Sequence, residues 1–320
     1  MTNAKKILIT GASGQIGSEL VNILAGIHGP GNIIATDIRK NTVFEEDGSV
    51  IFEFLDVTHK EQIEKIITKY DINTIYHMSA VLSATGEKKP QLAWDVNVNG
   101  TYYILEAARI LNVSRLFIPS SIAVFGPETP REKAPQDTIL KPRTIYGITK
   151  VSGELLCEYY VQHFGMDIRG CRYPGIISYT TPPGGGTTDY AVAIFYEAIK
   201  NKKYTCFVDK ETQLPMMYMP DCLKASLDLM EADFSRLKHH TGFNIAGMSF
   251  SAGELADEIK KHIPGFVCEY KPDFRQKIAD SWPRTIDDSA AREEWGWTPN
   301  HDLASMAADM IRALQEKKTL

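Results

Sequence analysis

The stretch Ile7-Leu-Ile-Thr-Gly-Ala-Ser-Gly-Gln-Ile-Gly17 decides the fold, because it joins a run of branched apolar residues to three glycines. The apolar run predicts a buried strand. The following residues predict a helix, since apolar side chains recur at three- and four-residue spacing, at Ile16, Leu20, Ile23, Leu24 and Ile27. The glycines allow a tight turn and a close approach of the backbone to a pyrophosphate, which a helix N-terminus attracts.

Alternating strand and helix patterns continue through the first half of the chain. Strands are predicted at residues 6–10, 32–36, 51–54, 74–77, 115–119 and 167–173. Residues 63–70 have helical spacing, and Thr58 with Glu61 has the pattern of a capping box before that helix. Because this alternation calls for a parallel sheet covered on both faces, we predict an α/β fold with a Rossmann-type, doubly wound parallel sheet.

A carboxylate at the end of the second predicted strand completes a dinucleotide-binding pattern. Asp37 lies twenty positions after Gly17, where a side chain that accepts hydrogen bonds from ribose hydroxyls belongs. Asp37 would repel a 2′-phosphate, which favours NAD, whereas Arg39 could accommodate that phosphate and keeps NADP open. Asp56 and Val57, after the third strand, are expected to contact the adenine; the alternative for Asp56 is a helix cap.

A tyrosine and a lysine four residues apart, in Tyr146-Gly-Ile-Thr-Lys150, open another predicted helix. Residues at this spacing share one helix face, although such pairs are also common in ordinary helices. A free tyrosine has a pKa of about 10, and a nearby ammonium together with a positive nicotinamide would lower it. Ser120 and Ser121 lie at a predicted strand end, where ligands bind in open α/β sheets; either could bind a substrate oxygen or stabilise a turn.

The strand–helix alternation stops after residue 173. Residues 181–188 form a Pro, Gly and Thr-rich loop, and a helix at 223–230 and a strand at 243–246, returning to the sheet, are predicted beyond it. We therefore expect a smaller C-terminal substrate-binding lobe. The expected NAD-binding domain and the expected lobe comprise residues 1–177 with 219–247 and residues 178–218 with 248–320, respectively.

Composition narrows the functional classes. The 320 residues are 43% hydrophobic and 23% charged with a net charge of −5, so no basic surface for nucleic acid is expected. Five cysteines without a close pair argue against a disulfide framework or a cysteine-based zinc site, and no HExxH motif suggests another metal site. No apolar run is long enough to cross a membrane, and the first strand begins too early to leave room for a cleavable leader, so we expect a cytoplasmic protein.

These motifs resemble the extended short-chain dehydrogenase/reductase superfamily over the whole chain. The matching residues are Gly11, Gly14, Gly17, Asn97, Ser121, Gly126, Tyr146 and Lys150. The resemblance implies NAD as the cofactor and a Ser–Tyr–Lys catalytic set. Tyr146 would exchange the hydroxyl proton, Lys150 would hold the nicotinamide ribose and tune the tyrosine, and Asn97 would support the active-site helix and a proton-relay water. Further cofactor contacts are expected at Gln15, Ile16, Ile38, Met78, Ser79, Ala80, Tyr173 and Ile176.

Within that superfamily the chain looks most like the short-chain L-threonine 3-dehydrogenases. The similar segments lie in both predicted lobes, at residues 14–17, 82–87, 94–100, 142–146, 172–178, 183–190, 215–220 and 294–297. Lys89, where asparagine is expected, departs from the pattern in a predicted surface loop. The resemblance implies metal-independent oxidation of L-threonine at its β-hydroxyl to 2-amino-3-oxobutanoate, with hydride transfer to NAD, in threonine catabolism.

A zwitterionic substrate needs donors for its carboxylate and an acceptor for its ammonium. The loop at 184–188 can supply backbone N–H groups and two hydroxyls, with a flexible connection between lobes as the alternative. Ser83 and Asp189 are candidates to orient the amino group and the β-hydroxyl. The full set of expected substrate contacts is Ser83, Ser121, Tyr146, Gly186, Thr187, Thr188 and Asp189.

Two other functions fit parts of the pattern. A nucleotide-sugar epimerase or dehydratase shares the fold, cofactor and Tyr/Lys pair, and Arg275, Arg284 and Arg292 could bind its diphosphate. A non-enzymatic NAD-sensing or scaffold protein would not need the Ser–Tyr–Lys set. Residues 96–111 and 146–164 carry more apolar surface than two sheet-packed helices need, and the superfamily resemblance implies a homodimer through a four-helix bundle there.

Overall fold

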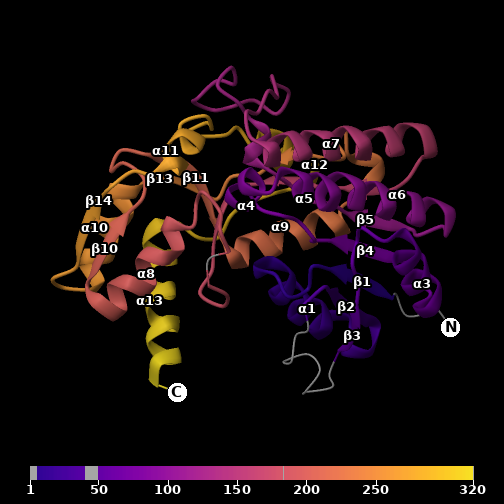
Figure 1. The fold of residues 1–320 in the computed structure, drawn as a ribbon, viewed down its shortest axis with the longest axis horizontal. Helices are drawn as coiled ribbons and strands as arrows, with labels where there is room; N and C mark the ends of the chain where they lie inside the picture. The colour runs from indigo at the N-terminus through magenta and orange to yellow at the C-terminus, as the bar shows by residue number, and fades with distance from the viewer. Residues whose placement is uncertain (1–5, 40–49, 183, 320) are drawn as a thin grey trace.

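The computed structural model describes residues 6–39, 50–182 and 184–319. Two lobes lie side by side in Figure 1, the larger built around the first half of the chain and the smaller mostly from the second half. Six strands form the central sheet: β1 (Ile7–Thr10), β2 (Ile33–Asp37), β3 (Ile51–Phe54), β4 (Thr74–His77), β5 (Arg115–Phe117) and β7 (Ile168–Arg169). They are parallel in the order β3-β2-β1-β4-β5-β7, which confirms the Rossmann-type sheet.

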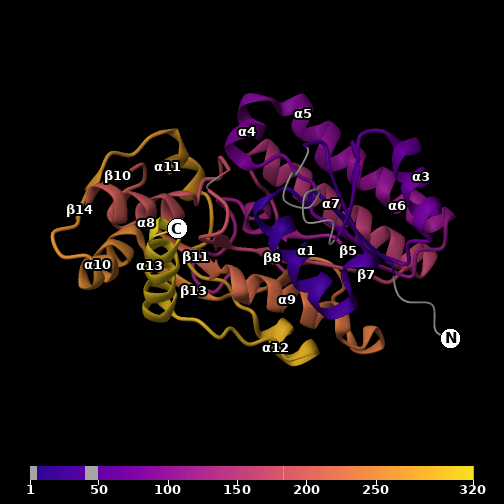
Figure 2. The same ribbon diagram turned by 90° about the horizontal axis from the view of Figure 1, so that it is seen from below.

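Helices cover both faces of this sheet (Figure 2). One face carries α3 (Lys60–Tyr70), α6 (Gly100–Ile110) and α7 (Ile145–Phe164), and the other carries α1 (Gln15–His28) and α9 (Met219–Glu231). Alternate residues of β1 belong to different apolar cores, because successive side chains of a strand point to opposite faces: Leu8 lies on the α3 side, and Ile7 and Ile9 lie on the α1 side. No helix in the described ranges is long and apolar enough to span a bilayer.

The smaller lobe has short sheets of its own. One contains β9 (Gly175–Ile177), β11 (Gln213–Tyr218) and β13 (Met248–Ser251), and β10 (Lys203–Cys206) pairs with β14 (Val267–Tyr270). The smaller lobe contains the helices α8 (Tyr190–Asn201), α10 (Ala252–His262), α11 (Phe274–Ala279) and α13 (Leu303–Thr319). Between α11 and α13 the chain forms α12 (Ser289–Trp295). Helix α12 lies apart from the others, beside the larger lobe, where it contacts the third short sheet (Figure 2).

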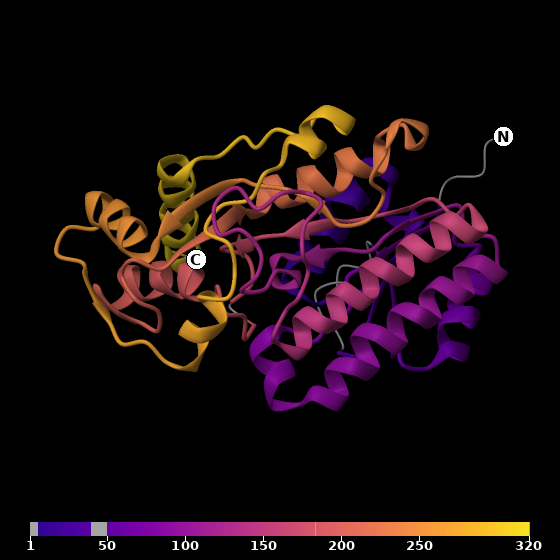
Figure 3. The same cartoon turned by 90° about the horizontal axis from the view of Figure 1, so that it is seen from above.

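Several short elements complete the fold. The third sheet has the order β12-β8-β6, made from β6 (Ser120–Ser121), β8 (Cys171–Tyr173) and β12 (Phe243–Asn244). Further helical segments are α4 (Ser83–Lys88), α5 (Pro90–Trp94), the π-helix η2 (Asp95–Asn99), and the 3₁₀ helices η1 (Pro30–Asn32), η3 (Ile122–Val124) and η4 (Phe234–Arg236). In Figure 3, α6 and α7 run side by side along one outer surface of the larger lobe.

Four sequence predictions need correction. The strand predicted at 167–173 is broken at Gly170, where a Cβ would lie 2.2 Å from the Ile118 carbonyl oxygen, so β7 and β8 enter different sheets. The strand predicted at 243–246 pairs with β8 rather than with the central sheet. The strand β3 is only partly buried, because it forms the sheet edge. The capping box is absent, since His59 is the N-cap of α3 and the Thr58 hydroxyl donates to Asp56 Oδ1 at 2.7 Å instead.

Candidate active site

The glycine turn after β1 packs directly on the loop after β4. Gly11 has φ +67°, and an added Cβ would lie 2.7 Å from the Ser79 backbone nitrogen and 2.8 Å from the Met78 carbonyl carbon. A Cβ on Gly17 would lie 2.2 Å from the Gly11 carbonyl oxygen. Because neither position has room for a side chain, the turn, the start of α1 and residues 78–79 form one continuous backbone surface at the carboxyl edge of the sheet.

The N-terminus of α1 suits the pyrophosphate of a dinucleotide. Its N-cap, Gly14, has no side-chain hydrogen bond to the helix, so the first-turn N–H groups keep no side-chain acceptor. The Gln15 side-chain nitrogen is buried nearby without a hydrogen-bond partner. A positive helix end beside an unpaired donor favours an anionic group, which makes this surface fit the predicted cofactor.

Asp37 holds its carboxylate beside the same turn. Its Oδ2 accepts a hydrogen bond from the Ser13 N–H at 3.0 Å and its Oδ1 accepts one from the Arg39 N–H at 2.9 Å. The exposed Arg39 guanidinium lies 3.5 Å from Asp37 Oδ1 and donates to the Ser13 carbonyl at 3.3 Å. Ile38, between them, is 60% exposed. The carboxylate is placed where ribose hydroxyls would be expected, and Arg39 lies close enough to reduce its negative field.

The expected adenine contacts lie at the start of α3. Asp56 Oδ1 accepts from both the N–H and the hydroxyl of Thr58, at 3.0 and 2.7 Å, so its side chain stabilises a turn. It does not cap the helix, whose N-cap is His59. Val57 is buried, with its Cγ2 3.0 Å from the place of a Cβ on Gly100.

Tyr146 lies in the first turn of α7, pressed against η3. The Thr144 hydroxyl caps the helix by accepting from the Gly147 N–H at 3.1 Å, and a Cβ on Gly147 would lie 2.2 Å from the Ala123 carbonyl oxygen. The Ser121 hydroxyl lies close enough to the Tyr146 phenol to lower its pKa, and it also accepts from the Ala123 N–H at 3.2 Å. Ser120 instead has a buried hydroxyl without a partner. Of the two serines, Ser121 is therefore the one that faces the tyrosine.

Lys150 lies one turn further along α7 but does not bond the phenol. Its ammonium donates to the Pro119 carbonyl at 2.8 Å and lies 5.8 Å from the centre of the Tyr146 ring. Burial raises the pKa of Tyr146 to about 12, against a smaller lowering by the Ser121 hydrogen bond, and burial lowers the pKa of Lys150 to about 8. In the chain without its cofactor the pKa of Tyr146 is therefore raised, and the lowering expected from Lys150 together with a bound nicotinamide stays a prediction.

Asn97 ties the loop after β4 to the active-site helix. It lies in the π-helix η2; its Oδ1 accepts from the Val81 N–H at 2.8 Å, and its Nδ2 donates to the Val81 carbonyl at 3.0 Å and to the Thr149 hydroxyl at 3.1 Å. A cavity of about 20 Å³ lies beside it, lined also by Ser120 and Lys150. That volume suffices for one water molecule, for which these side chains supply polar partners.

The expected substrate residues meet where the two lobes touch. The hydroxyls of Ser83 in α4 and Thr187 in the loop before α8 are 3.2 Å apart, and both residues are buried. On the same helix, a Cβ on Gly86 would lie 3.9 Å from the Tyr146 Cβ, so α4 packs against both the loop and the tyrosine. Thr188 packs on β9, its Cγ2 being 2.8 Å from the place of a Cβ on Gly175.

Two backbone donors of this loop already have a partner. Asp189 Oδ2 accepts from the Gly185 N–H at 2.7 Å and from the Gly186 N–H at 2.8 Å. In the structure without substrate these two N–H groups are therefore occupied by Asp189, and their binding of a substrate carboxylate stays a prediction. Pro183, within the segment 183–190, lies outside the described residues.

The hydrogen-bond partners of Tyr173 and His77 could not be predicted from the sequence patterns. The Tyr173 hydroxyl is bonded to the Ser226 hydroxyl at 2.5 Å, so its polar end faces α9, while Ile176 is only partly buried. His77, the first residue of the segment 77–80 that resembles a loop passing under the cofactor, is buried at the end of β4, with Nδ1 2.8 Å from the Thr10 hydroxyl and Nε2 unpartnered. Burial, with the Lys150 charge nearby, lowers the pKa of His77 to about 3, so it is neutral. Apart from that resemblance, its only sequence signal is a polar residue ending an apolar strand.

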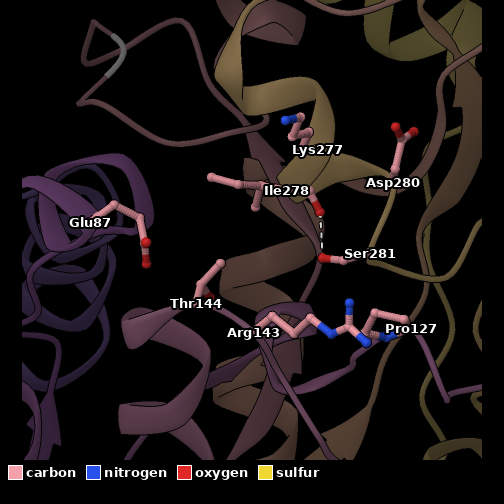
Figure 4. A pocket seen from close by; sticks show the side chains of 8 residues that line it. All are labelled: Glu87, Pro127, Arg143, Thr144, Lys277, Ile278, Asp280 and Ser281. Carbon is pink, nitrogen blue, oxygen red and sulfur yellow. Dashed lines mark hydrogen bonds between the residues drawn. The ribbon is translucent and has the colours of Figure 1, made fainter.

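An open cavity of about 400 Å³ lies between the lobes (Figure 4). Side chains from α4, the chain before α7, and α11 line it: Glu87, Pro127, Arg143, Thr144, Lys277, Ile278, Asp280 and Ser281. Glu87 Oε1 accepts from the Ile145 N–H at 2.8 Å, directly before Tyr146. The cavity thus reaches the chain two residues before Tyr146, at Thr144. In the described part of the chain, no three His, Cys, Asp or Glu side chains gather in a way that could hold a metal ion.

Comparison with known proteins agrees with this geometry. The model of the NAD dependent epimerase/dehydratase family matches residues 7–246. The structure of an L-threonine dehydrogenase from Clostridium difficile is 53% identical, with 98% of each chain covered and a TM-score of 0.95. One from Phytophthora infestans is 49% identical, covering 98% of this chain and 100% of its own, with a TM-score of 0.94. A monomeric L-threonine 3-dehydrogenase from a metagenome is 48% identical over 97% and 99% of the chains, also with a TM-score of 0.94.

The parallel sheet, the glycine turn and the buried Ser121–Tyr146 pair define an enzyme of the extended short-chain dehydrogenase/reductase class. Both lobes take part in the match to solved structures, since nearly the whole chain is covered. The chain belongs to the NAD dependent epimerase/dehydratase family.

Proposed function

We propose that this enzyme oxidises L-threonine at its β-hydroxyl to 2-amino-3-oxobutanoate, with NAD as the hydride acceptor. The observation that carries the proposal is that α4 packs against Tyr146 through Gly86 and contacts Thr187 through Ser83. One short helix thus links a proton acceptor to the polar side chains of the loop before α8. The names of relatives at 53% and 49% identity support threonine as the substrate.

NAD, when bound, supplies the acceptor for the hydride that leaves the substrate β-carbon. The chain would hold it through the N–H groups of α1, the loop at 78–80 and the Lys150 ammonium. Asp37 would accept hydrogen bonds from the ribose hydroxyls, and its charge disfavours a 2′-phosphate. Tyr173 and Ile176 would form the apolar wall of the nicotinamide pocket.

Tyr146 acts as the general base in this proposal. Its phenolate oxygen takes the β-hydroxyl proton, and the Ser121 hydroxyl donates a hydrogen bond to the oxygen as the carbonyl forms. Because burial raises the pKa of Tyr146 to about 12, the phenolate needs positive charge beside it, and Lys150 lies one helical turn away. A water in the cavity between Asn97 and Lys150 would carry the proton onward. With tyrosine as the base, the reaction needs no metal.

The substrate groups are assigned by chemistry. Ser83, Thr187 and Thr188 supply hydroxyls, Gly186 supplies a backbone N–H, and Asp189 is the carboxylate suited to the substrate ammonium. Residues 1–177 with 219–247 would form the NAD-binding part. Residues 178–218 with 248–320 would form the lobe that supplies most of these groups.

The nucleotide-sugar alternative is disfavoured by ion pairing. Arg275 is bonded to Asp273 and Arg292 to Asp288, at 2.6 and 2.7 Å, and Arg284 lies 3.6 Å from Glu132. A diphosphate would have to compete with a carboxylate for each of these arginines.

A spectrophotometric assay tests the proposal. Purified protein is mixed with L-threonine and NAD, with NADP and L-serine as control arms, and NADH absorbance is followed. We expect NADH to accumulate with threonine and NAD, and much more slowly with NADP or serine. An epimerase would return its NADH to NAD within each turnover, so a lack of accumulation, together with turnover of a nucleotide sugar, would replace the proposed function with the alternative.

A further inference from the structure

In the loop before α8, the backbone N–H groups of Gly185 and Gly186 form an anion-binding site, called the cradle below, and the Asp189 side chain occupies it. The N–H groups of Gly185 and Gly186 converge on one oxygen of Asp189, at 2.7 and 2.8 Å. Successive N–H groups that point to one place are a common way for a backbone to bind a carboxylate or phosphate. Here the bound anion is a side chain three and four residues further along.

The glycines make this close contact feasible. A Cβ on Gly186 would lie 2.7 Å from Asp189 Oδ1, so a side chain there would push the carboxylate out of the cradle. Gly185 has φ +98°, a conformation that residues with side chains rarely adopt. The local sequence is therefore suited to bring an anion against these two N–H groups.

The cradle lies beside the proposed substrate position. The place of a Cβ on Gly185 is 3.3 Å from the Thr85 hydroxyl on α4, and the next residue but one, Thr187, touches Ser83 on the same helix. The same helix also contacts Tyr146, through Gly86, three residues after Ser83. An α-amino acid whose β-hydroxyl meets Tyr146 has its carboxylate two bonds from the reacting carbon, within the same small space.

We propose that the Asp189 carboxylate is an internal stand-in for the substrate carboxylate, and that the two exchange places during binding. The incoming carboxylate accepts the Gly185 and Gly186 hydrogen bonds, and the displaced Asp189 carboxylate pairs with the substrate ammonium. No covalent bond changes, and the ammonium offsets the second anion. The inference rests on the proposed function, because it takes an α-amino acid as the substrate class.

This exchange explains selection for a zwitterion. A hydroxy acid without an ammonium would displace Asp189 but leave that partly buried carboxylate with the Arg275 charge and no substrate cation, in place of its two hydrogen bonds, which is unfavourable. An amino alcohol without a carboxylate would leave Asp189 in its cradle. Only a ligand with both charged groups satisfies the N–H donors and the displaced carboxylate together.

Binding to the NADH-loaded enzyme tests the exchange, measured by calorimetry with two half-substrates. One is 3-hydroxybutanoate, which lacks the ammonium, and the other is 1-aminopropan-2-ol, which lacks the carboxylate. In the Asp189→Asn variant the neutral amide accepts the two N–H bonds less strongly and no longer repels an anion. We therefore expect 3-hydroxybutanoate to bind this variant at least tenfold more tightly than wild type. The affinity for 1-aminopropan-2-ol should not increase. Asp257→Asn, which removes an exposed carboxylate on α10, should change neither.

A second variant keeps the test independent of how the introduced amide behaves in the cradle. Gly186→Ala retains the Asp189 charge and both N–H groups but pushes the carboxylate outward, and it should also tighten 3-hydroxybutanoate binding. The exchange is overturned if neither variant gains affinity for 3-hydroxybutanoate. Turnover of L-threonine by the wild type is read separately, so failure of the proposed function and failure of the exchange give different results.

Discussion

At the scale of single residues, burial dominates the chemistry of the proposed catalytic pair. It raises the pKa of Tyr146 and lowers that of Lys150, so both groups are biased towards their neutral forms. His77, which is close enough for the Lys150 charge to act on it, is neutral and adds no positive charge beside the phenol. The protein without its cofactor therefore keeps the phenol protonated, and activation depends on positive charge arriving next to it.

The buried lysine predicts a specific pH dependence of stability. Its pKa is about 8 in the folded chain and 10.5 when unfolded, so between these values the unfolded chain binds more protons and the free energy of unfolding rises with pH. Lys150→Met should remove this rise. Urea unfolding at pH 8 and pH 10 should show the wild type gaining roughly 2 kcal/mol more than the variant over that interval. An equal change in both proteins would show that Lys150 is not desolvated.

Sequence patterns identified candidate site residues more reliably than the hydrogen-bond partners of those residues. The positions of Gly11, Asp37 and Tyr146 follow from spacing, because a turn, a strand end and a helix face each fix where such a residue can lie. The bond from Asp189 back to the Gly185 and Gly186 N–H groups could not, since it depends on how one loop folds on itself. For the same reason the choice between Ser120 and Ser121 needed the structure.

At the scale of elements, the contact between α1 and the glycine turn controls the cofactor surface. Gly17→Ala would place a Cβ 2.2 Å from the Gly11 carbonyl oxygen and must move the helix or the turn. We expect a loss of about 1–3 kcal/mol in stability and at least a tenfold loss in NAD affinity. Urea unfolding and NADH fluorescence titration measure the two effects.

Gly26→Ala, near the other end of the same helix, is the matched control. Nothing lies within 4 Å of the added Cβ, and alanine favours helix over glycine by about 1 kcal/mol. The control should be at least as stable as wild type and bind NAD equally well. If Gly17→Ala behaved like this control, the turn would not need its close packing.

The strands were predictable where a strand lies between two parallel neighbours, as β1, β2 and β4 do. Prediction failed where the chain changes sheets. The run at 167–173 looks continuous because its residues all suit a strand, and only the approach of Gly170 to the Ile118 carbonyl shows why it bends. Similarly, β12 pairs with β8 and not with a strand of the central sheet. Hydrophobic spacing predicts that a segment is a strand but does not indicate which sheet it joins.

At the scale of the whole molecule, α6 and α7 run side by side along one outer surface (Figure 3), and both helices carry exposed large apolar side chains. These residues are Tyr102, Ile110, Ile148, Leu155 and Tyr159, each more than 40% exposed. We propose a homodimer that buries this surface in a four-helix bundle, although one relative is described as monomeric. Sedimentation at micromolar concentration should give twice the 35.8 kDa chain mass, and Leu155→Arg should give the monomer mass. A monomeric wild type would contradict the dimer.

The most direct test of the central claim is threonine oxidation by Tyr146→Phe, which removes only the phenolic oxygen. General base catalysis contributes about 10²–10⁴-fold, so kcat should fall by at least 10²-fold while the affinity for NAD, measured by calorimetry, stays within about twofold of wild type. Turnover near the wild-type rate, with the cofactor bound normally, would show that another group takes the proton.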